Sequence, residues 1–186
     1  MKINNESSTF SEIDSMGTNM MRFSFWLKSG HIPLTAIITG ANNQMAEFLS
    51  QRECFNYLFL KNKNKLKSID HICEDHKLEY DNILFLFDDI LDLDVAQIAG
   101  LRFMIKNNSS PLLENYVRKN LLTDYISYNS GNSGAVREIS ELIIGLNNNY
   151  DTCINERRKF STLYNNYLNI RNSIQTIILE DNSRDI

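Results

Sequence analysis

Short apolar runs alternate with amphipathic stretches along most of the chain. The runs of strand-forming residues predict strands over 34–40, 55–60, 83–87, 101–105 and 125–128. Apolar residues at helical spacing predict helices over 14–30, 42–49, 64–76, 95–99, 111–121 and 135–144. The connections are too long for hairpins, so we expect an α/β protein whose parallel sheet carries helices on both faces.

The helix ends have their own signals. Asp14 or Ser15 is predicted to cap the first helix, Asn42 or Asn43 the second, and Pro111 occupies a favoured first helical position. Beyond Gly145, the segment Tyr150–Glu180 has apolar residues near helical period. It is predicted to be one long amphipathic helix that packs on the body or on another subunit.

These patterns divide the chain into three parts. Residues 1–13 are polar and form a flexible N-terminus, residues 14–145 form the α/β domain, and residues 146–186 form a C-terminal helical extension. The last six residues are expected to fray.

The segment Ile83–Asp92 is the most informative. Five apolar residues lead directly into Asp88 and Asp89, and Asp92 follows. This pattern is typical of a buried parallel strand whose carboxyl end carries charge, and such ends are where α/β proteins place their chemistry. One carboxylate there can hold a divalent cation while Asp92 orients it. The alternative, equally weighted on this stretch alone, is that Asp88 or Asp89 caps a helix starting at Leu91.

Composition narrows the classes of function. The 186 residues suffice for one domain, and a net charge of −4 argues against electrostatic binding of nucleic acid. Three cysteines without CxxC spacing fit a reducing compartment better than a disulfide scaffold. There is no signal-peptide pattern and no apolar run of membrane-spanning length. We therefore expect a soluble cytoplasmic protein that binds neither nucleic acid nor membrane.

Residues suited to phosphate chemistry follow three predicted strands. Thr39 and Gly40 end the first strand and can donate a hydroxyl and an amide to a phosphate oxygen, and Lys65 lies just after the second. Asp88 and Asp92 follow the third. Taken singly, these are an ordinary strand-end residue, a surface lysine and helix caps. Taken together, they predict a site for a phosphate ester held by threonine, lysine and a metal.

Five segments carrying these residues occur in a telling order: Phe10-Ser11-Glu12-Ile13-Asp14-Ser15-Met16-Gly17, Ala36-Ile37-Ile38-Thr39-Gly40, Asn64-Lys65-Leu66, Asp88-Asp89-Ile90-Leu91-Asp92 and Gly131-Asn132-Ser133-Gly134-Ala135-Val136-Arg137-Glu138. This order resembles the haloacid-dehalogenase (HAD) superfamily, in the subgroup of 3-deoxy-D-manno-octulosonate 8-phosphate phosphatases and related sugar phosphatases. The resemblance covers about residues 10–145. Each motif alone is weak, but their joint order is specific.

The resemblance implies a role for each site residue. Thr39 and Gly40 bind the phosphoryl group, and Lys65 neutralises it and serves catalysis. Asp88 and Asp92 are the metal residues, Asp88 as the ligand of Mg²⁺ and Asp92 as its support. Enzymes of this kind react through an aspartyl-phosphate formed by an Asp nucleophile, with a second Asp as general acid and base. Both lie in an Asp-x-Asp-Gly motif at the end of the family's first strand.

This sequence contains no such motif. It begins where the family's first strand and hairpin should already have passed, and residues 1–9 cannot supply a buried strand. Asp92-Leu93-Asp94 has the spacing but belongs to the fourth motif. By resemblance the missing strand lies between those ending at Thr39 and Asp88. Its absence predicts a gap lined by unpaired backbone groups, each costing ~1–3 kcal/mol if buried.

The sequence therefore predicts a HAD-type Mg²⁺-dependent phosphatase of a small sugar phosphate that lacks its nucleophile and is inactive in this form, through a late start codon or a truncated gene. Ala41 stands where related sugar-acid phosphatases often carry Arg, and Phe87 replaces a glycine. One alternative is a non-catalytic phosphate-binding or scaffolding protein whose last helix makes homo-oligomer contacts. Another is complementation by a first strand from another chain.

Overall fold

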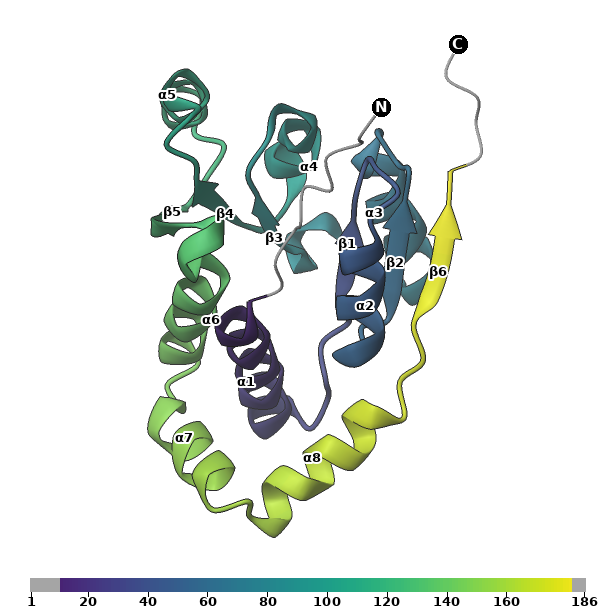
Figure 1. The fold of residues 1–186 in the computed structure, drawn as a ribbon, viewed down its shortest axis with the longest axis vertical. Coiled ribbons are helices and arrows are strands. Elements are labelled where there is room, and N and C mark those ends of the chain that lie inside the picture. The colour runs from purple at the N-terminus through teal and green to yellow at the C-terminus, as the bar shows by residue number, and fades with distance from the viewer. Residues whose placement is uncertain (1–10, 182–186) are drawn as a thin grey trace, which may run out of the picture.

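The strands form two separate three-stranded parallel sheets (Figure 1). The structure is a computed structural model that describes residues 11–181. One sheet has the order β1-β2-β6, built from Ala36–Ile38, Tyr57–Leu60 and Ile177–Glu180. The other has the order β3-β4-β5, built from Leu84–Phe87, Leu101–Lys106 and Tyr125–Ser130. The predicted α/β class with parallel strands is confirmed, and the division falls between the strands ending near Thr39 and Asp88, as expected.

Helices connect and cover the strands (Figure 1). They are α1 (Glu12–Ser29), α2 (Gln44–Arg52), α3 (Lys65–His76), α4 (Leu93–Ile98), α5 (Pro111–Lys119), α6 (Ala135–Leu146), α7 (Tyr150–Arg158) and α8 (Thr162–Asn172). Three short 3₁₀ turns are η1 (Tyr80–Asn82), η2 (Ile90–Asp92) and η3 (Gly131–Ser133). No helix within residues 11–181 is both long and apolar enough to cross a membrane.

Most helix ends follow the local sequence. Asn43 caps α2 by accepting the amides of Met45 and Ala46, and Pro111 begins α5, both as predicted. The predicted cap of α1 is wrong, because Ser11 and not Asp14 or Ser15 fills that position. Ser11 caps the helix by accepting the Asp14 amide, so the Asp14 carboxylate is not needed as the cap.

The prediction of one long C-terminal helix is also wrong. The chain turns at Phe160, whose φ of +48° lies in the left-handed region, and Ser161 then caps α8 by accepting the Tyr164 amide. After α8 the β-branched pair at the start of β6 joins the edge of β2. The apolar spacing is shared by two helices and a strand, so periodicity alone could not reveal the breaks.

The C-terminal segment packs on the body, which is one of the two arrangements expected for it. Tyr164 and Tyr167 of α8 are buried against Met20 and Phe23 of α1, with Cys153 of α7 in the same cluster. Residues 182–186 of the expected frayed end and residues 1–10 of the expected flexible N-terminus lie outside the described residues.

Two helix pairs join the sheets. On one side, Ile69 and Cys73 of α3 and Val95 of α4 are buried against Ile38 of β1 and Phe85 of β3. On the other, α1 packs along α6, which covers the β3-β4-β5 sheet. The sheets are therefore held as neighbours by side-chain packing, without a strand ladder between them.

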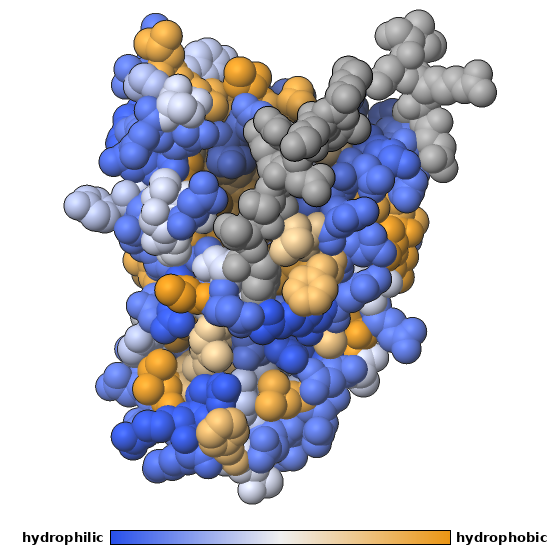
Figure 2. Space-filling view, in the orientation of Figure 1, coloured by the Kyte–Doolittle hydropathy of each residue, from blue (hydrophilic) through white to orange (hydrophobic). Residues whose placement is uncertain are grey.

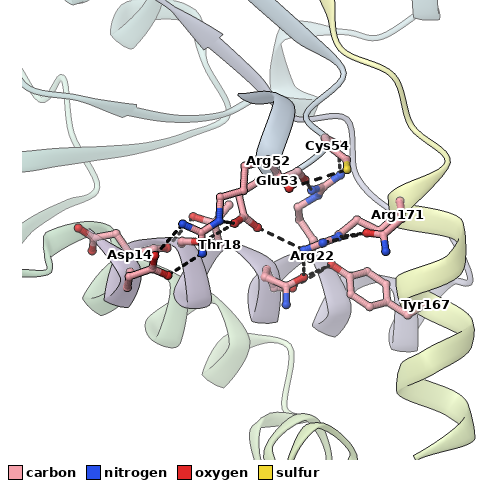
Figure 3. Close-up of polar contacts among 12 residues, drawn as sticks. Asp14, Thr18, Arg22, Arg52, Glu53, Cys54, Tyr167 and Arg171 are labelled. Carbon is pink, nitrogen blue, oxygen red and sulfur yellow. Dashed lines mark hydrogen bonds and ion pairs between the residues drawn. The ribbon is translucent and has the colours of Figure 1, made fainter. Parts of the chain in front are cut away.

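A buried polar network ties α1 to the β1-β2-β6 sheet and to α8 (Figure 3). Arg22, fully buried, donates to the carbonyls of Glu53 at 2.6 Å and Cys54 at 3.0 Å. Burial removes water from the guanidinium and lowers the pKa of Arg22 below its usual value. The two carbonyls replace that water as hydrogen-bond acceptors. Arg171 of α8 pairs with the Glu53 carboxylate at 3.2 Å.

Candidate functional site

The residues predicted to form the site lie at the carboxyl ends of β1, β2 and β3. Asp92, on η2 after β3, is almost fully buried and accepts a bond from the Lys65 ammonium at the start of α3. Its other carboxylate oxygen accepts the backbone amides of Asp88 at 3.4 Å and Asp89 at 3.1 Å. Asp92 therefore fixes both the lysine and the loop that carries Asp88.

The capping interpretation of the acidic stretch is also partly correct. The carboxylate of Asp89 accepts the amide of Ile90 at 2.7 Å and caps η2, which begins at Ile90 and not at Leu91. Within residues 11–181 the Asp88 side chain caps no helix, and Asp88 stands at the tip of β3. The two interpretations thus apply to different aspartates.

Backbone hydrogen bonds fix Thr39 at the end of β1. Its amide donates to Phe59 of β2 at 2.9 Å, and its carbonyl accepts the amide of Asn62 at 3.0 Å. The Thr39 hydroxyl accepts the Ala41 amide at 3.3 Å, so its own proton is available to a ligand. Gly40 follows in the same turn. No bond within the described residues joins Thr39 directly to Lys65 or Asp88.

Sequence reasoning missed Asn62. This side chain is 8% exposed, and its amide nitrogen donates to Ser68 in the first turn of α3 at 2.7 Å. Together with the Thr39 carbonyl, it links the tip of β1 to the helix that carries Lys65. Its Oδ1 is buried without a partner in the described structure. Only the fold could reveal this link, because an Asn between two lysines carries no motif.

Electrostatics at Asp88 favour a cation. Asp88 reaches solvent at its surface, but the protein packed around it desolvates the carboxyl, and this burial raises its pKa. The nearby charge of Asp92 raises the pKa of Asp88 further, while Lys65 opposes the shift. A positive ion at Asp88 would relieve this unfavourable ionisation.

The described residues hold no group of three His, Cys, Asp or Glu side chains in a metal-binding arrangement. Asp88 is exposed, whereas Asp92 is buried and already engaged by the Lys65 ammonium and two backbone amides. That Asp88 holds a cation, with Asp92 as its support, stays a prediction of the sequence. Direct ligation by Asp92 stays a prediction.

Two further motifs of the sequence contact each other and form a structural joint. The Asp14 carboxylate accepts the Arg137 amide at 2.8 Å, and Gly17 lies against the Arg137 backbone. Glu138 then holds the end of β5 through bonds to the backbone of Tyr128 and Asn129. The segments at 11–17 and 131–138 are thus brought together by the packing of α1 on α6.

This combination defines a class of protein: a parallel α/β protein with a lysine-carboxylate site at the carboxyl ends of its strands, where the strand order reverses. Comparison with known proteins finds similar phosphatases. No family model matches the sequence. The 3-deoxy-D-manno-octulosonate 8-phosphate phosphatases KdsC of Salmonella typhi and of Escherichia coli K12 are each 26% identical over 109 residues, 59% of this chain and 54% of those proteins.

Solved structures extend the match. A probable YrbI family phosphatase from Pseudomonas syringae is 27% identical, with a TM-score of 0.67 over 90% of this chain and 82% of that one. The 3-deoxy-D-manno-octulosonate 8-phosphate phosphatase from Moraxella catarrhalis, solved with magnesium, phosphate and KDO, is 25% identical, with a TM-score of 0.64 over 82% of each chain. These similarities support the predicted resemblance to the HAD superfamily, in the 3-deoxy-D-manno-octulosonate 8-phosphate phosphatase-like subgroup. It spans about half the length of the curated relatives it matches.

Proposed function

We propose that this chain carries the phosphate- and Mg²⁺-binding half of a phosphomonoesterase site for a small sugar phosphate, without the Asp nucleophile. The carrying observation is the contact of Lys65 with Asp92, whose carboxylate also binds the amides of Asp88 and Asp89. It joins the lysine motif to the acidic motif, although 27 residues separate them in the sequence.

Each residue then has a distinct task. Thr39 donates its hydroxyl proton to a phosphate oxygen, and the Lys65 ammonium offsets the phosphate charge. Asp88 holds Mg²⁺, which when bound neutralises further phosphate charge. Asp92 keeps Lys65 and the Asp88 loop in place. Because the Asp92 carboxylate already pairs with Lys65, the Lys65 ammonium is held in place before phosphate binds.

The substrate class is supported by the relatives, which are named for a sugar phosphate. Ala41 offers no cation for a sugar carboxylate next to Thr39. We therefore propose that the chain recognises the phosphate ester, and we do not extend recognition of a sugar acid from the relatives to this chain.

The catalytic step needs a carboxylate that this sequence does not supply at the right place. The Asp92 carboxylate cannot be that nucleophile while it holds Lys65 and two amides. We expect the purified chain to bind phosphate and Mg²⁺ but not to hydrolyse para-nitrophenyl phosphate, with or without the metal. Metal-dependent turnover would mean that another Asp attacks.

Binding is measured by calorimetric titration of inorganic phosphate in the presence of Mg²⁺. Lys65→Met should weaken phosphate binding roughly tenfold or more, because a charge-assisted hydrogen bond is lost. Lys67→Met is the matched control, since Lys67 is exposed on the same helix. Asp88→Asn should remove the Mg²⁺ dependence, whereas Asp94→Asn, exposed on α4, should not. Equal effects in the test and control variants would contradict the proposal, and so would a chain that binds no phosphate.

A further inference from the structure

The C-terminal strand β6 contacts the connection between β2 and α3, although β6 lies outside the segment that resembles the phosphatases. β6 runs parallel to β2, with Leu60 opposite Glu180. The Asp181 amide donates to the Leu60 carbonyl at 3.1 Å, and the Lys61 ammonium donates to the Glu180 carboxylate at 2.8 Å. β6 therefore ends against the first residue of the connection, residues 61–65, which we call the lysine loop.

The backbone of Lys61 is strained. Its φ of +56° lies in the left-handed region, which is unfavourable for a residue with a Cβ atom. The Lys61 amide donates to the Ala41 carbonyl at 3.3 Å, and the next amide, of Asn62, donates to the Thr39 carbonyl at 3.0 Å. Successive residues of a regular strand turn opposite ways, so the left-handed turn is what lets both amides bond to the turn after β1. Such a conformation persists only where the surrounding structure holds it.

The turn at Lys61 also connects the two residues assigned to phosphate binding. Thr39 is held through its carbonyl by Asn62, whose side chain donates to Ser68 in the first turn of α3 at 2.7 Å. The same helix begins at Lys65. A relaxation of the Lys61 backbone would therefore move Thr39 relative to Lys65.

β6 is an exposed edge strand. Within residues 11–181 its outer edge has no strand partner, and Ile177 and Ile178 are 50% and 37% exposed. Figure 2 shows this apolar surface at the right-hand edge of the molecule, where Figure 1 places β6. The side chains of Lys61 and Glu180 are 44% and 41% exposed. An ion pair this exposed adds little to global stability, so its effect is expected in the geometry of the lysine loop.

We infer that β6 is a positioning strand for the phosphate site and that Glu180 is its positioning residue. The ion pair with Glu180 holds the left-handed turn of Lys61, with help from the strand ladder at Leu60. That turn keeps Thr39 and Lys65 at the spacing that one phosphate group requires. The inference rests on the proposed function, because the assignment of Thr39 and Lys65 to phosphate belongs to it.

A purely electrostatic role for Glu180 predicts the opposite result. Its carboxylate offsets the charge of Lys61, so its removal would leave the lysine loop more positive and strengthen phosphate binding. A positioning role predicts weaker binding, because Lys61 loses a contact that holds its backbone. The sign of the change in affinity separates the two roles.

The first test is calorimetric titration of the full chain with inorganic phosphate in the presence of Mg²⁺. Glu180→Gln should weaken binding about two- to fivefold, the range set by an exposed ion pair. In the Lys61→Gly background the same change should have no effect, because glycine adopts a left-handed φ without support. Glu114→Gln, which breaks an ion pair with Arg118 on α5, is the matched control and should leave the affinity unchanged.

Proline substitutions test the strand ladder. The amides of Ile177 and Asp181 bond to β2, so residue 179 also turns its amide toward β2 and residue 178 turns its amide away. Leu179→Pro should therefore detach the end of β6 and weaken phosphate binding by roughly fivefold or more. Ile178→Pro is the control and should change the affinity by less than about twofold, because its amide makes no bond to β2. Equal losses in the two variants would contradict a role for the ladder.

Hydrogen exchange tests the geometry without any ligand. In Glu180→Gln, exchange at the amides of Lys61 and Asn62 should be roughly threefold faster or more, because these amides bond to the turn after β1. Exchange at Phe59, within the ladder of β1 and β2, should stay unchanged.

The results also separate this inference from the proposed function. Tighter phosphate binding by Glu180→Gln, an equal loss in the Lys61→Gly background, or unchanged exchange at Lys61 and Asn62 would each overturn the positioning role. A parent chain that binds no phosphate would contradict the proposed function. Faster exchange in Glu180→Gln would then still support the link from β6 to the lysine loop, and unchanged exchange would overturn that link as well.

Discussion

At the scale of single residues, Glu138 shows how one carboxylate can order a chain segment. It accepts the Tyr125 hydroxyl at 2.7 Å, the amides of Tyr128 at 2.7 Å and Asn129 at 2.9 Å, and the Asn129 side chain at 2.8 Å. Burial raises the pKa of Glu138, but these bonds together outweigh it and bring the pKa below its ordinary value of 4.5. The folded state therefore favours the ionised form.

The lowered pKa of Glu138 makes the folded state less stable in acid. Because the folded pKa of Glu138 is lower than the unfolded one, the unfolded state binds more protons in acid. The stabilisation is complete above the ordinary pKa and is lost as the pH falls through the folded pKa. Glu138→Gln should lower the free energy of unfolding by about 1–2 kcal/mol at neutral pH and reduce the loss of stability between neutral pH and about pH 3. Urea unfolding across this range measures both.

Glu114→Gln is the control for this prediction. Glu114 forms an i,i+4 pair with Arg118 on α5, and such a pair contributes only a few tenths of a kcal/mol. Its replacement should leave the pH profile unchanged. If Glu138→Gln kept the full acid dependence, the assignment to Glu138 would be wrong.

At the scale of elements, α8 shows why the C-terminal segment belongs to the body. The hydroxyl of Tyr167, fully buried, donates to Asn19 of α1, lying 2.9 Å from Oδ1 and 3.0 Å from the backbone carbonyl. The Tyr164 hydroxyl accepts the Asn19 side-chain amide at 2.8 Å. Asn19 is thus a polar contact point inside an aromatic cluster.

Tyr167→Phe should lower the free energy of unfolding by about 1–2 kcal/mol, because the hydroxyl is lost while the ring stays. Tyr116→Phe on α5 is the matched control, since the Tyr116 side chain is 53% exposed, and it should change stability by less than about 0.5 kcal/mol. Chemical unfolding followed by circular dichroism compares the two. Equal changes would show that the Tyr167 hydroxyl does not hold α8 to α1.

At the scale of the whole molecule, α1 is the element that joins the parts. It packs on α6, which covers one sheet, bonds to the Glu53 and Cys54 carbonyls in the connection that leads into β2 of the other, and packs against α8. The close approach to α6 depends on Gly17, where a Cβ atom would lie 2.9 Å from the Arg137 Cα. A backbone atom cannot yield as a flexible side chain can.

Gly17→Ala should therefore cost about 1–3 kcal/mol of unfolding free energy through overpacking, despite the better helix propensity of alanine. Gly145→Ala, within α6, is the control, because nothing lies within 4 Å of its Cβ position. There alanine should stabilise by about 0.5–1 kcal/mol. Thermal unfolding of both variants measures the opposite signs, and a shared sign would refute the role of Gly17.

The sequence predicted the strands well because each is a short apolar run bounded by turn residues. It also predicted the joint order of Thr39, Lys65 and Asp88 at successive strand ends. It failed in the C-terminal segment. There the helix breaks at Phe160 and Ser161, although the apolar spacing continues without a break across two helices and a strand. It also missed Asn62 and the partners of Asp14 and Glu138, since these contacts connect distant segments.

The sequence by itself therefore determined the α/β class, the parallel strands and the residue types at their carboxyl ends, because apolar period and turn chemistry are local properties. Only the tertiary structure decided that Asp92 holds Lys65, that α1 links the two sheets and that β6 lies beside β2. These depend on which distant segments pack together. The division between β1 and β3 belongs to both levels: the missing motif predicted it, and the fold shows two sheets with no strand ladder between them in the described residues.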